Sequence, residues 1–124
     1  MSYIDGFVIA VPKTSREKFI QHAETADAVF MEWGATRVFE CWEDDVPDGT
    51  VTDFRRAVQA KDDEAVVFSW IEWPDKQSRD AGMKKMMAAM ETDPRVSAEN
   101  NPMPFDGSRM IFGGFVPVVA LEKS

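Results

Sequence analysis

The chain has 124 residues, the usual length of one domain, so residues 1–124 are predicted to form a single domain. A composition that is 44% hydrophobic, with four Trp and nine Phe, excludes wholesale disorder. The net charge of −8, with dispersed bases, argues against nucleic acid or an anionic membrane surface as a partner. No apolar run approaches the roughly 20 residues that span a bilayer, and no signal-peptide pattern is present, so a cytoplasmic protein is expected.

The single cysteine, Cys41, excludes an internal disulfide and a cysteine-based metal site. Its acidic neighbours disfavour a thiolate, so we interpret it as a small packing residue. The acidic run EDDVPD, residues 43–48, lacks the alternating ligand spacing of a calcium loop. No motif implies a metal or a cofactor, and the cofactor remains unknown.

The first 35 residues predict a strand followed by a helix. Residues 3–11, YIDGFVIAV, alternate and are rich in β-branched and aromatic residues, as in a strand. A helix is predicted over residues 14–33, because Thr14 and Glu17 have capping-box spacing and Gly34 is placed as a stop. Its apolar stripe consists of Phe19, Ala23, Ala26, Phe30 and Trp33.

The middle of the chain predicts two more strands. Residues 36–44, TRVFECWED, form the first, and residues 64–73, EAVVFSWIEW, form the second. Between them, residues 53–60 fit either a short helix capped by Asp53 or a ragged strand, and we favour the helix.

The last third predicts a helix and a final strand. The helix begins near Asp75, and its methionines at i, i+3, i+4 and i+7 are interpreted as core-facing rather than as a soft-metal site. The strand lies within residues 109–119, RMIFGGFVPVV, and is interrupted by Gly113 and Gly114. Either Gly114 leaves a gap in a ligand chamber while Gly113 admits a helix, or the two glycines form a plain bulge. The methionines are Met83, Met86, Met87 and Met90.

This order predicts an α+β, ferredoxin-like βαββαβ fold. Right-handed crossovers give an antiparallel sheet in the order 4-1-3-2 with both helices on one face. Aromatic residues occur at both parities of the strands, so the second face also needs a cover. The simplest cover is a second copy, and we expect a homodimer in which two sheets form a dimeric α/β barrel.

Six blocks of sequence stand out in order along the chain, namely YIDGFV, ECWEDDVPDG, TDFRRAV, VVFSWIEWP, DPR and MPFDGSRMIFGGF. Together they resemble the YbaA-like proteins, domain-of-unknown-function family 1428, over roughly residues 2–115. The resemblance implies a dimeric α/β barrel within a superfamily of cofactor-poor monooxygenases, muconolactone-type isomerases, haem-degrading enzymes and stress-response barrels. Two positions depart from the family pattern, since Phe112 stands where a tyrosine is usual and Val116 where an acid is frequent.

Three carboxylates are candidate catalytic groups. Strand parity places Asp5, Glu40 and Glu72 together in the predicted barrel interior, where crowding would raise at least one pKa toward the range of a general acid or base. Asp5 and Glu72 are expected to be neighbours. The alternative is that these acids pair with arginines such as Arg37 or lie in solvent at the barrel mouth.

The same parity argument predicts a pocket for a small hydrophobic or aromatic ligand. His22 borders the apolar stripe of the first helix and is either a base, an axial haem ligand or a packing residue. We expect Arg109 at the opposite end of the sheet from Asp5, anchoring the preceding loop. The predicted pocket residues are Tyr3, Phe7, Trp42, Phe68, Trp70, Phe112, Gly114 and His22.

Three functions remain open on this evidence. The first is a small-molecule-binding dimeric barrel with an aromatic, acid-containing pocket. The second is a cofactor-poor enzyme, monooxygenase-like or isomerase-like, that acts on a hydrophobic aromatic compound with carboxylate acid and base. The third is a structural dimer with a filled core. The fold does not choose among them, because one fold carries many functions.

Overall fold

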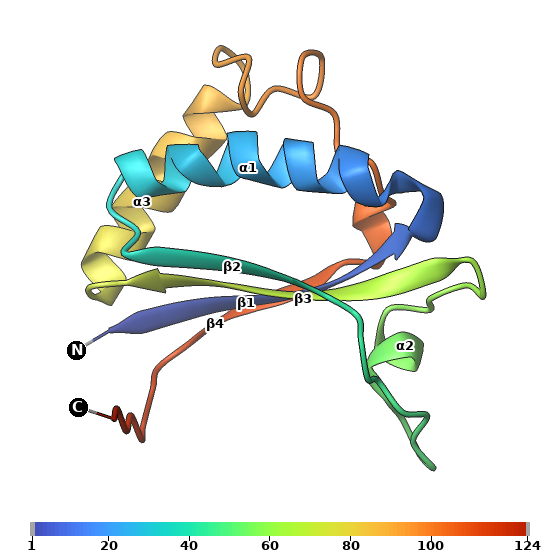
Figure 1. The fold of residues 1–124 in the computed structure, drawn as a ribbon. Helices are drawn as coiled ribbons and strands as arrows, with labels where there is room; N and C mark the ends of the chain where they lie inside the picture. Colours follow the sequence, from blue (N-terminus) through green and yellow to red (C-terminus); the bar gives the residue numbers. More distant parts are fainter. Residues whose placement is uncertain (1, 124) are drawn as a thin grey trace.

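The computed structural model describes residues 2–123 as one antiparallel sheet with its two long helices packed on one face (Figure 1). The strand order is β2-β3-β1-β4, so the predicted ferredoxin-like topology is confirmed. The strands are β1 (Tyr3–Pro12), β2 (Arg37–Trp42), β3 (Glu64–Trp73) and β4 (Ile111–Phe115). The helices are α1 (Arg16–Glu32), α2 (Phe54–Ala57) and α3 (Lys76–Ala89), with 3-10 turns η1 (Lys13–Ser15) and η2 (Gly107–Arg109).

Helix α1 differs from the prediction at its N-terminal end only. The Thr14 capping box is wrong, because residues 13–15 form a 3-10 turn and α1 starts after Ser15 without a side-chain cap. That turn makes its own backbone bond, from Arg16 N–H to the Lys13 carbonyl. Gly34 follows the helix with φ of +115°, the left-handed conformation expected of a glycine stop.

The helix predicted within residues 53–60 is confirmed as α2. The Asp53 carboxylate accepts a hydrogen bond from the backbone N–H of Arg56, which caps the first turn. Asp75 caps α3 in the same way by accepting from Ser78 N–H. Local capping therefore fixes where both of these helices begin.

The methionine stripe of α3 is only partly core-facing. Met86 is buried and Met83 half-buried, but Met87 is 72% exposed and Met90 51% exposed. The helix approaches the sheet through Gly82, where an added Cβ would lie 2.5 Å from the Trp73 ring. This contact turns the Gly82 and Met86 side of α3 inward and leaves the other two methionines in solvent.

The register of β1 against β3 decides which side chains share a face. Tyr3 pairs with Trp73 and Asp5 with Ile71, so the odd residues of both strands lie under α1 and α3. Two of the three buried clusters lie on that covered face, and the third, Ala10, Val58 and Val66, lies on the other face beside α2. The two on the covered face contain Ile9, Val11, Phe19, Ala23 and Val67, and Tyr3, Ala35, Ile71 and Trp73.

The prediction that these strand residues form one barrel interior is wrong, because they lie on two faces of the sheet. It joined odd residues of β1 to even residues of β3, whereas Phe68, Trp70 and Glu72 lie on the opposite face from Asp5 and Glu40. Parity sorts residues within a strand, but only the pairing register relates one strand to the next. The aromatic residues of β3 therefore face away from the helices, and the acids of β1 and β2 face toward them.

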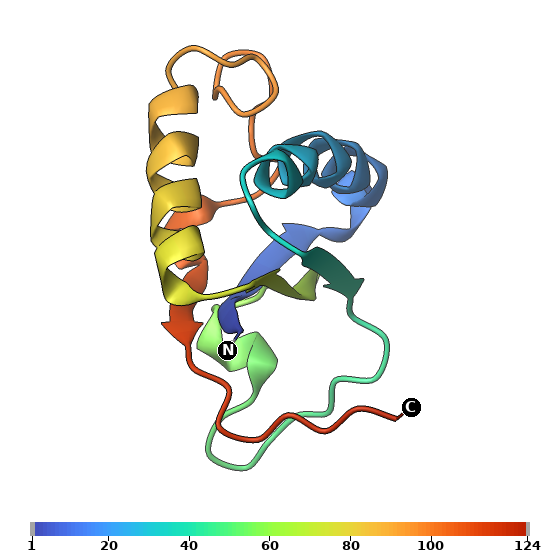
Figure 2. The same cartoon turned by 90° about the vertical axis from the view of Figure 1, so that its left-hand side faces the viewer.

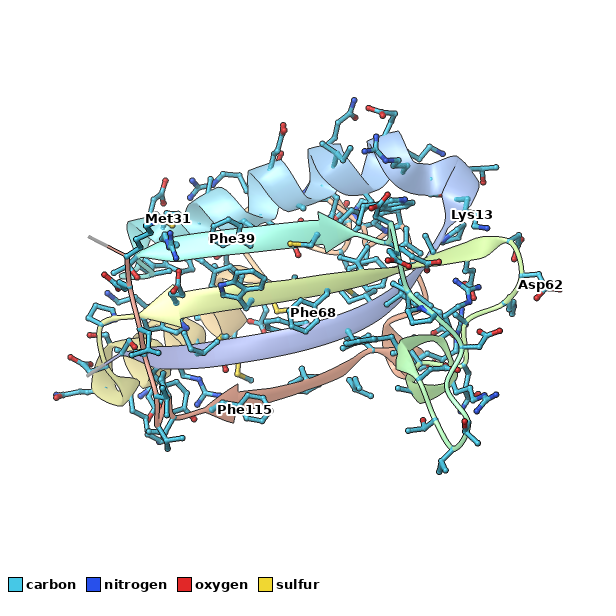
Figure 3. All side chains as sticks on the ribbon, turned by 60° about the horizontal axis from the view of Figure 1, so that its bottom comes forward. Lys13, Met31, Phe39, Asp62, Phe68 and Phe115 are labelled. Carbon is cyan, nitrogen blue, oxygen red and sulfur yellow. The ribbon has the colours of Figure 1, made fainter. Side chains whose placement is uncertain are left out.

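The face without long helices, which we call the open face, is apolar. Phe39 is 38% exposed, Phe68 44% and Phe115 62%, and all three are visible in Figure 3. The segment after β4 and the loop that carries α2 both project on this side of the sheet (Figures 1 and 2). The open face comprises Ile4, Gly6, Val8, Phe39, Cys41, Phe68, Trp70, Ile111, Gly113 and Phe115.

Candidate functional site

A pair of carboxyl groups, Asp27 of α1 and Glu40 of β2, lies between the helix and the sheet. Both line a cleft of about 380 Å³, which we call the acid cleft. The cleft forms because β2 is an edge strand and α1 runs alongside it (Figure 1), so that inward-facing side chains meet at the rim of the core. Its lining residues are Arg16, Phe19, Ile20, Ala23, Glu24, Asp27, Val38, Glu40 and Trp42.

The two carboxyl groups titrate abnormally because they are buried together. Burial, followed by repulsion from and hydrogen bonding with Glu40, raises the pKa of Asp27 to about 8. Burial also raises the pKa of Glu40, although hydrogen bonds with Asp27 and Ser69 oppose this shift. At neutral pH the pair therefore retains a proton, and Asp27 is the carboxyl group that holds it.

Glu40 also has an unsatisfied oxygen. Its Oε1 is buried and has no hydrogen-bond partner within residues 2–123. Leaving a buried acceptor unpaired costs about 1–3 kcal/mol, and more when the group is charged. A donor entering the acid cleft would recover that energy.

The mouth of the acid cleft combines a cation with an aromatic ring. The Arg16 guanidinium lies over the Trp42 ring, with its carbon 5.5 Å from the ring centre. Trp42 also packs against Phe19, with ring centres 6.2 Å apart. The cleft thus has an apolar floor, an acid pair inside and a guanidinium at its edge.

Asp5, by contrast, is fully paired. Its carboxylate accepts hydrogen bonds from Arg79 Nε and Nη2, the latter at 2.9 Å, and from Trp73 Nε1 at 2.9 Å. Only 3% of Asp5 is exposed. A carboxylate held by three donors is anchored as a structural anion, so this geometry does not favour it as a base.

The packing of side chains around Asp5 also explains why residue 114 is a glycine. A Cβ there would lie 2.3 Å from the Tyr3 hydroxyl and 2.9 Å from Arg79 Nη2. Gly114 therefore gives room to packed Tyr3 and Arg79 rather than to a ligand chamber. Gly113 lies on the open face under the Phe115 ring and admits no helix, so the predicted chamber and helix contact are wrong. The alternative of a bulge is wrong too, because β1 and β4 pair without interruption through both glycines.

Glu72 lies on the open face, away from Asp5, so their predicted proximity is wrong. Asp5 is paired in the ladder with Ile71, and Glu72 with Ile4. Glu72 instead forms an ion pair with Arg37, which is the alternative that the sequence left open. Arg109 lies at the other end of the sheet, as expected, and donates to Glu64 and Asp106.

The remaining predicted pocket residues separate into three places. Phe7, Phe68, Trp70 and Phe112 border a groove of about 710 Å³ on and beside the open face. Trp42 lines the acid cleft, and Tyr3 is packed under Arg79, with the guanidinium carbon 5.1 Å from its ring centre. His22 lines a third cavity, against residues 94–104.

Sequence reasoning missed two residues, Asp27 and Arg79. Asp27 follows Ala23 by four residues, so it continues the apolar stripe of α1 toward the sheet. An acid inside such a stripe is a detectable signal for a buried carboxylate. Arg79 stands in the first turn of α3 with no comparable signal.

Within residues 2–123 no group of three His, Cys, Asp or Glu side chains is placed to hold a metal ion. None of the helices described is long and apolar enough to cross a bilayer.

Residues 2–107 match the protein family described as "Protein of unknown function (DUF1428)". The chain belongs to this family. A DUF1428-type relative, the uncharacterized protein YbaA of Escherichia coli (strain K12), is 52% identical over 119 residues, which cover 96% of this chain and 98% of YbaA. YbaA of Shigella flexneri is similar to the same extent. The resemblance noted in the sequence is thereby confirmed.

Two solved structures share the fold of this DUF1428 chain. A dimeric ferredoxin-like protein from an uncultured marine organism aligns with a TM-score of 0.58 and 12% identity, over 98% of each chain. SnoaB, a cofactor-independent oxygenase from Streptomyces nogalater, aligns with a TM-score of 0.59 and 18% identity, also over 98% of each chain. At these identities the similarity establishes the ferredoxin-like fold.

Proposed function

We propose that the acid cleft binds a small, mainly apolar molecule that carries a hydroxyl or N–H group. The observation that carries the proposal is the buried, unpaired Oε1 of Glu40 at a cleft with apolar walls. A ligand donor would satisfy that oxygen, and the ring of Trp42 would cover the apolar part. An aromatic alcohol has both features.

Binding of p-cresol, followed by two-dimensional NMR, tests this proposal. We expect saturable shifts at the Trp42 indole and at Ala23, and an affinity about tenfold lower for Glu40→Gln, whose amide presents one acceptor instead of two. Glu24→Gln is the matched control, because Glu24 borders the same cleft but is exposed. Equal affinity of Glu40→Gln and the parent protein would contradict the proposal.

A second candidate function, proton transfer, is favoured by the pKa of about 8 at Asp27. An acid that holds its proton at neutral pH beside an ionised carboxylate supplies a general acid and a general base together. Glu40 would take a proton from the carbon next to a ketone while Asp27 gives its proton to the ketone oxygen. This forms an enol, needs no oxidant or cofactor, and leaves the proton count of the pair unchanged.

Phenylpyruvate is a suitable probe of this chemistry, since it has a ketone, an acidic C–H bond, a ring and a carboxylate that Arg16 would attract. We expect keto–enol conversion faster than in buffer, declining above about pH 8 as Asp27 loses its proton. Both Asp27→Asn and Glu40→Gln should remove it, and Glu24→Gln should not. A rate equal to buffer at every pH would leave the cleft as a binding site without this chemistry.

We also infer that the open face is covered by a second copy of the chain. Its exposed Phe39, Phe68 and Phe115 form one surface, and the related fold from a marine organism is described as dimeric. A native mass spectrum should show a dimer. Phe68→Asp should give a monomer, whereas Met87→Asp, at an exposed methionine on α3, should not. A monomeric parent protein would refute the inference.

A further inference from the structure

A cleft separate from the acid cleft lies between α1 and the loop of residues 94–104. Its volume is about 680 Å³, and α1 contributes Lys18, Gln21, His22 and Thr25 to its lining. The loop folds back over the flank of α1 in Figures 1 and 2. This His22 cleft is lined by Ser15, Lys18, Gln21, His22, Thr25, Pro94, Arg95, Asn100, Asn101, Pro102, Met103 and Pro104.

Asn101 has a fixed orientation in this cleft. Its Nδ2 donates to the Arg95 carbonyl at 2.6 Å and to the His22 carbonyl at 3.4 Å. Both partners are acceptors, so the amide nitrogen must face them and the amide oxygen must face the His22 ring. Asn101 Oδ1 lies 2.9 Å from His22 Nδ1.

This contact fixes the tautomer of His22. Because Oδ1 of Asn101 only accepts, Nδ1 must carry a proton, and the neutral ring then presents Nε2 as an acceptor. Nε2 has no hydrogen-bond partner in residues 2–123 and is not among their buried unpaired atoms. The ring is also held edge-on to Phe105, with centres 6.3 Å apart. His22 is therefore an oriented acceptor that ligands can reach.

Lys18 supplies a positive charge at one helical turn from His22. Residues four apart lie on the same side of a helix, and both side chains line this cleft. Lys18 is exposed and forms no ion pair in the described part of the chain, whereas Arg95 is neutralised by Asp93 and Glu32. Although the net charge of the protein is −8, the unpaired Lys18 gives this cleft a positive charge that favours an anion.

We propose that the His22 cleft binds small molecules that carry an oxyanion and a hydroxyl group. The oxyanion, a phosphate or a carboxylate, pairs with Lys18, and the hydroxyl donates to Nε2 of His22. Asn101 acts as the positioning residue that keeps Nε2 free. The chemistry shared by sugar phosphates and hydroxy acids fits this arrangement.

His22 is the only histidine of the chain, so its ring signals report on this cleft alone. Long-range ¹H–¹⁵N NMR of the free protein at pH 8 should show the tautomer with the proton on Nδ1. Observation of the Nε2–H tautomer would overturn the proposal at its first step. Asn101→Ala should release the ring to mixed tautomers, and Glu99→Ala, at an exposed neighbour outside the cleft, should leave it unchanged.

Titration with glycerol 3-phosphate and with malate, at constant ionic strength, then tests the ligand class. We expect saturable His22 shifts, and the tighter of the two ligands identifies the preferred oxyanion. Methyl phosphate, as its dianion at pH 8, and succinate lack a hydroxyl donor and should bind at least about tenfold more weakly, since one hydrogen bond is lost. Equal binding of these controls, or no saturable shift with either ligand, would overturn the proposal.

The charge contribution is tested by Lys18→Gln, which should weaken binding about tenfold or more. Lys84→Gln is the matched control, because Lys84 is an exposed lysine on α3 outside this cleft. An equal loss in both variants would show a general effect of net charge and would contradict a site at Lys18.

Discussion

Asp5 and Glu40 are acids on the same covered face of one sheet, yet their surroundings are opposite. Asp5 is held by Arg79 and by the indole of Trp73, whereas Glu40 faces another acid, Asp27, and keeps an unpaired oxygen. In the first arrangement, the charge of Asp5 is neutralised by Arg79, and the ion pair holds β1 against α3. The second leaves a proton and an acceptor available at a cleft. Burial alone therefore does not mark a functional carboxylate, and the partner decides its role.

The largest expected effect is at Asp5. Asp5→Ala leaves Arg79 without its buried counter-ion and Trp73 without an acceptor, so we expect a loss of about 3–5 kcal/mol in the free energy of unfolding. Urea denaturation measures this loss. The control is Asp80→Ala, which removes the exposed partner of Arg79 and should cost less than about 1 kcal/mol. Similar losses in both variants would remove the contrast between Asp5 and Glu40.

A second paired acid, Glu64, extends the comparison to the other end of the sheet. The hydrogen bonds from Arg109 are the main reason that the pKa of Glu64 falls from 4.5 to about 2. A lowered folded pKa means that the unfolded chain binds protons first, so this stability is present above about pH 4.5 and is lost between pH 4.5 and 2. Glu64→Gln should cost about 2–3 kcal/mol at pH 7 and flatten the acid limb of the stability curve. An unchanged acid limb would refute this assignment.

The two glycines of β4 test how tightly the Asp5 cluster is packed. Gly114→Ala places a methyl group against the Tyr3 hydroxyl and Arg79, and should cost about 1–3 kcal/mol. Gly113→Ala, where the nearest Phe115 atoms are 3.5 Å away, should change stability by less than about 0.5 kcal/mol. Thermal unfolding of the two variants makes the comparison within one strand. Equal effects would mean that the covered face has room at Gly114.

The smallest expected effect has the opposite sign and belongs to Asp27. Its folded pKa, about 8, is above the 3.8 of the unfolded chain, so folding takes up a proton and stability falls as pH rises from about 4 to 8. Asp27→Asn removes that dependence and should be more stable than the parent at pH 8, because its amide donates to Glu40 without ionising, and this advantage should shrink at pH 5. Chemical denaturation at pH 5 and pH 8 measures both quantities. A variant less stable than the parent at pH 8 would contradict a raised pKa at Asp27.

Much of the contrast between Asp5 and Glu40 could not be predicted from the sequence. Alternation and turn residues were sufficient for the strands, for α2 and for the sheet order. Of the three acids of which at least one was expected to have a raised pKa, Glu40 has one, although its neighbour is Asp27 rather than Asp5 or Glu72. The predicted partners failed because β1 and β3 pair in a register that no local pattern specifies, which moved Phe68, Trp70 and Glu72 to the open face. Asp27 and Arg79 reach their acids only after the helices dock, so their roles depend on tertiary packing.

The distribution of the tryptophans gives the molecule separate optical reporters. Trp73 is fully buried with its indole N–H on Asp5, Trp42 lines the acid cleft, and Trp70 lies on the open face. Replacing the others with phenylalanine would assign one fluorescence signal to each region. Trp70 emission would then shift to shorter wavelength when a second copy excludes water, Trp42 emission would respond to an occupant of the cleft, and Trp73 would change only on unfolding.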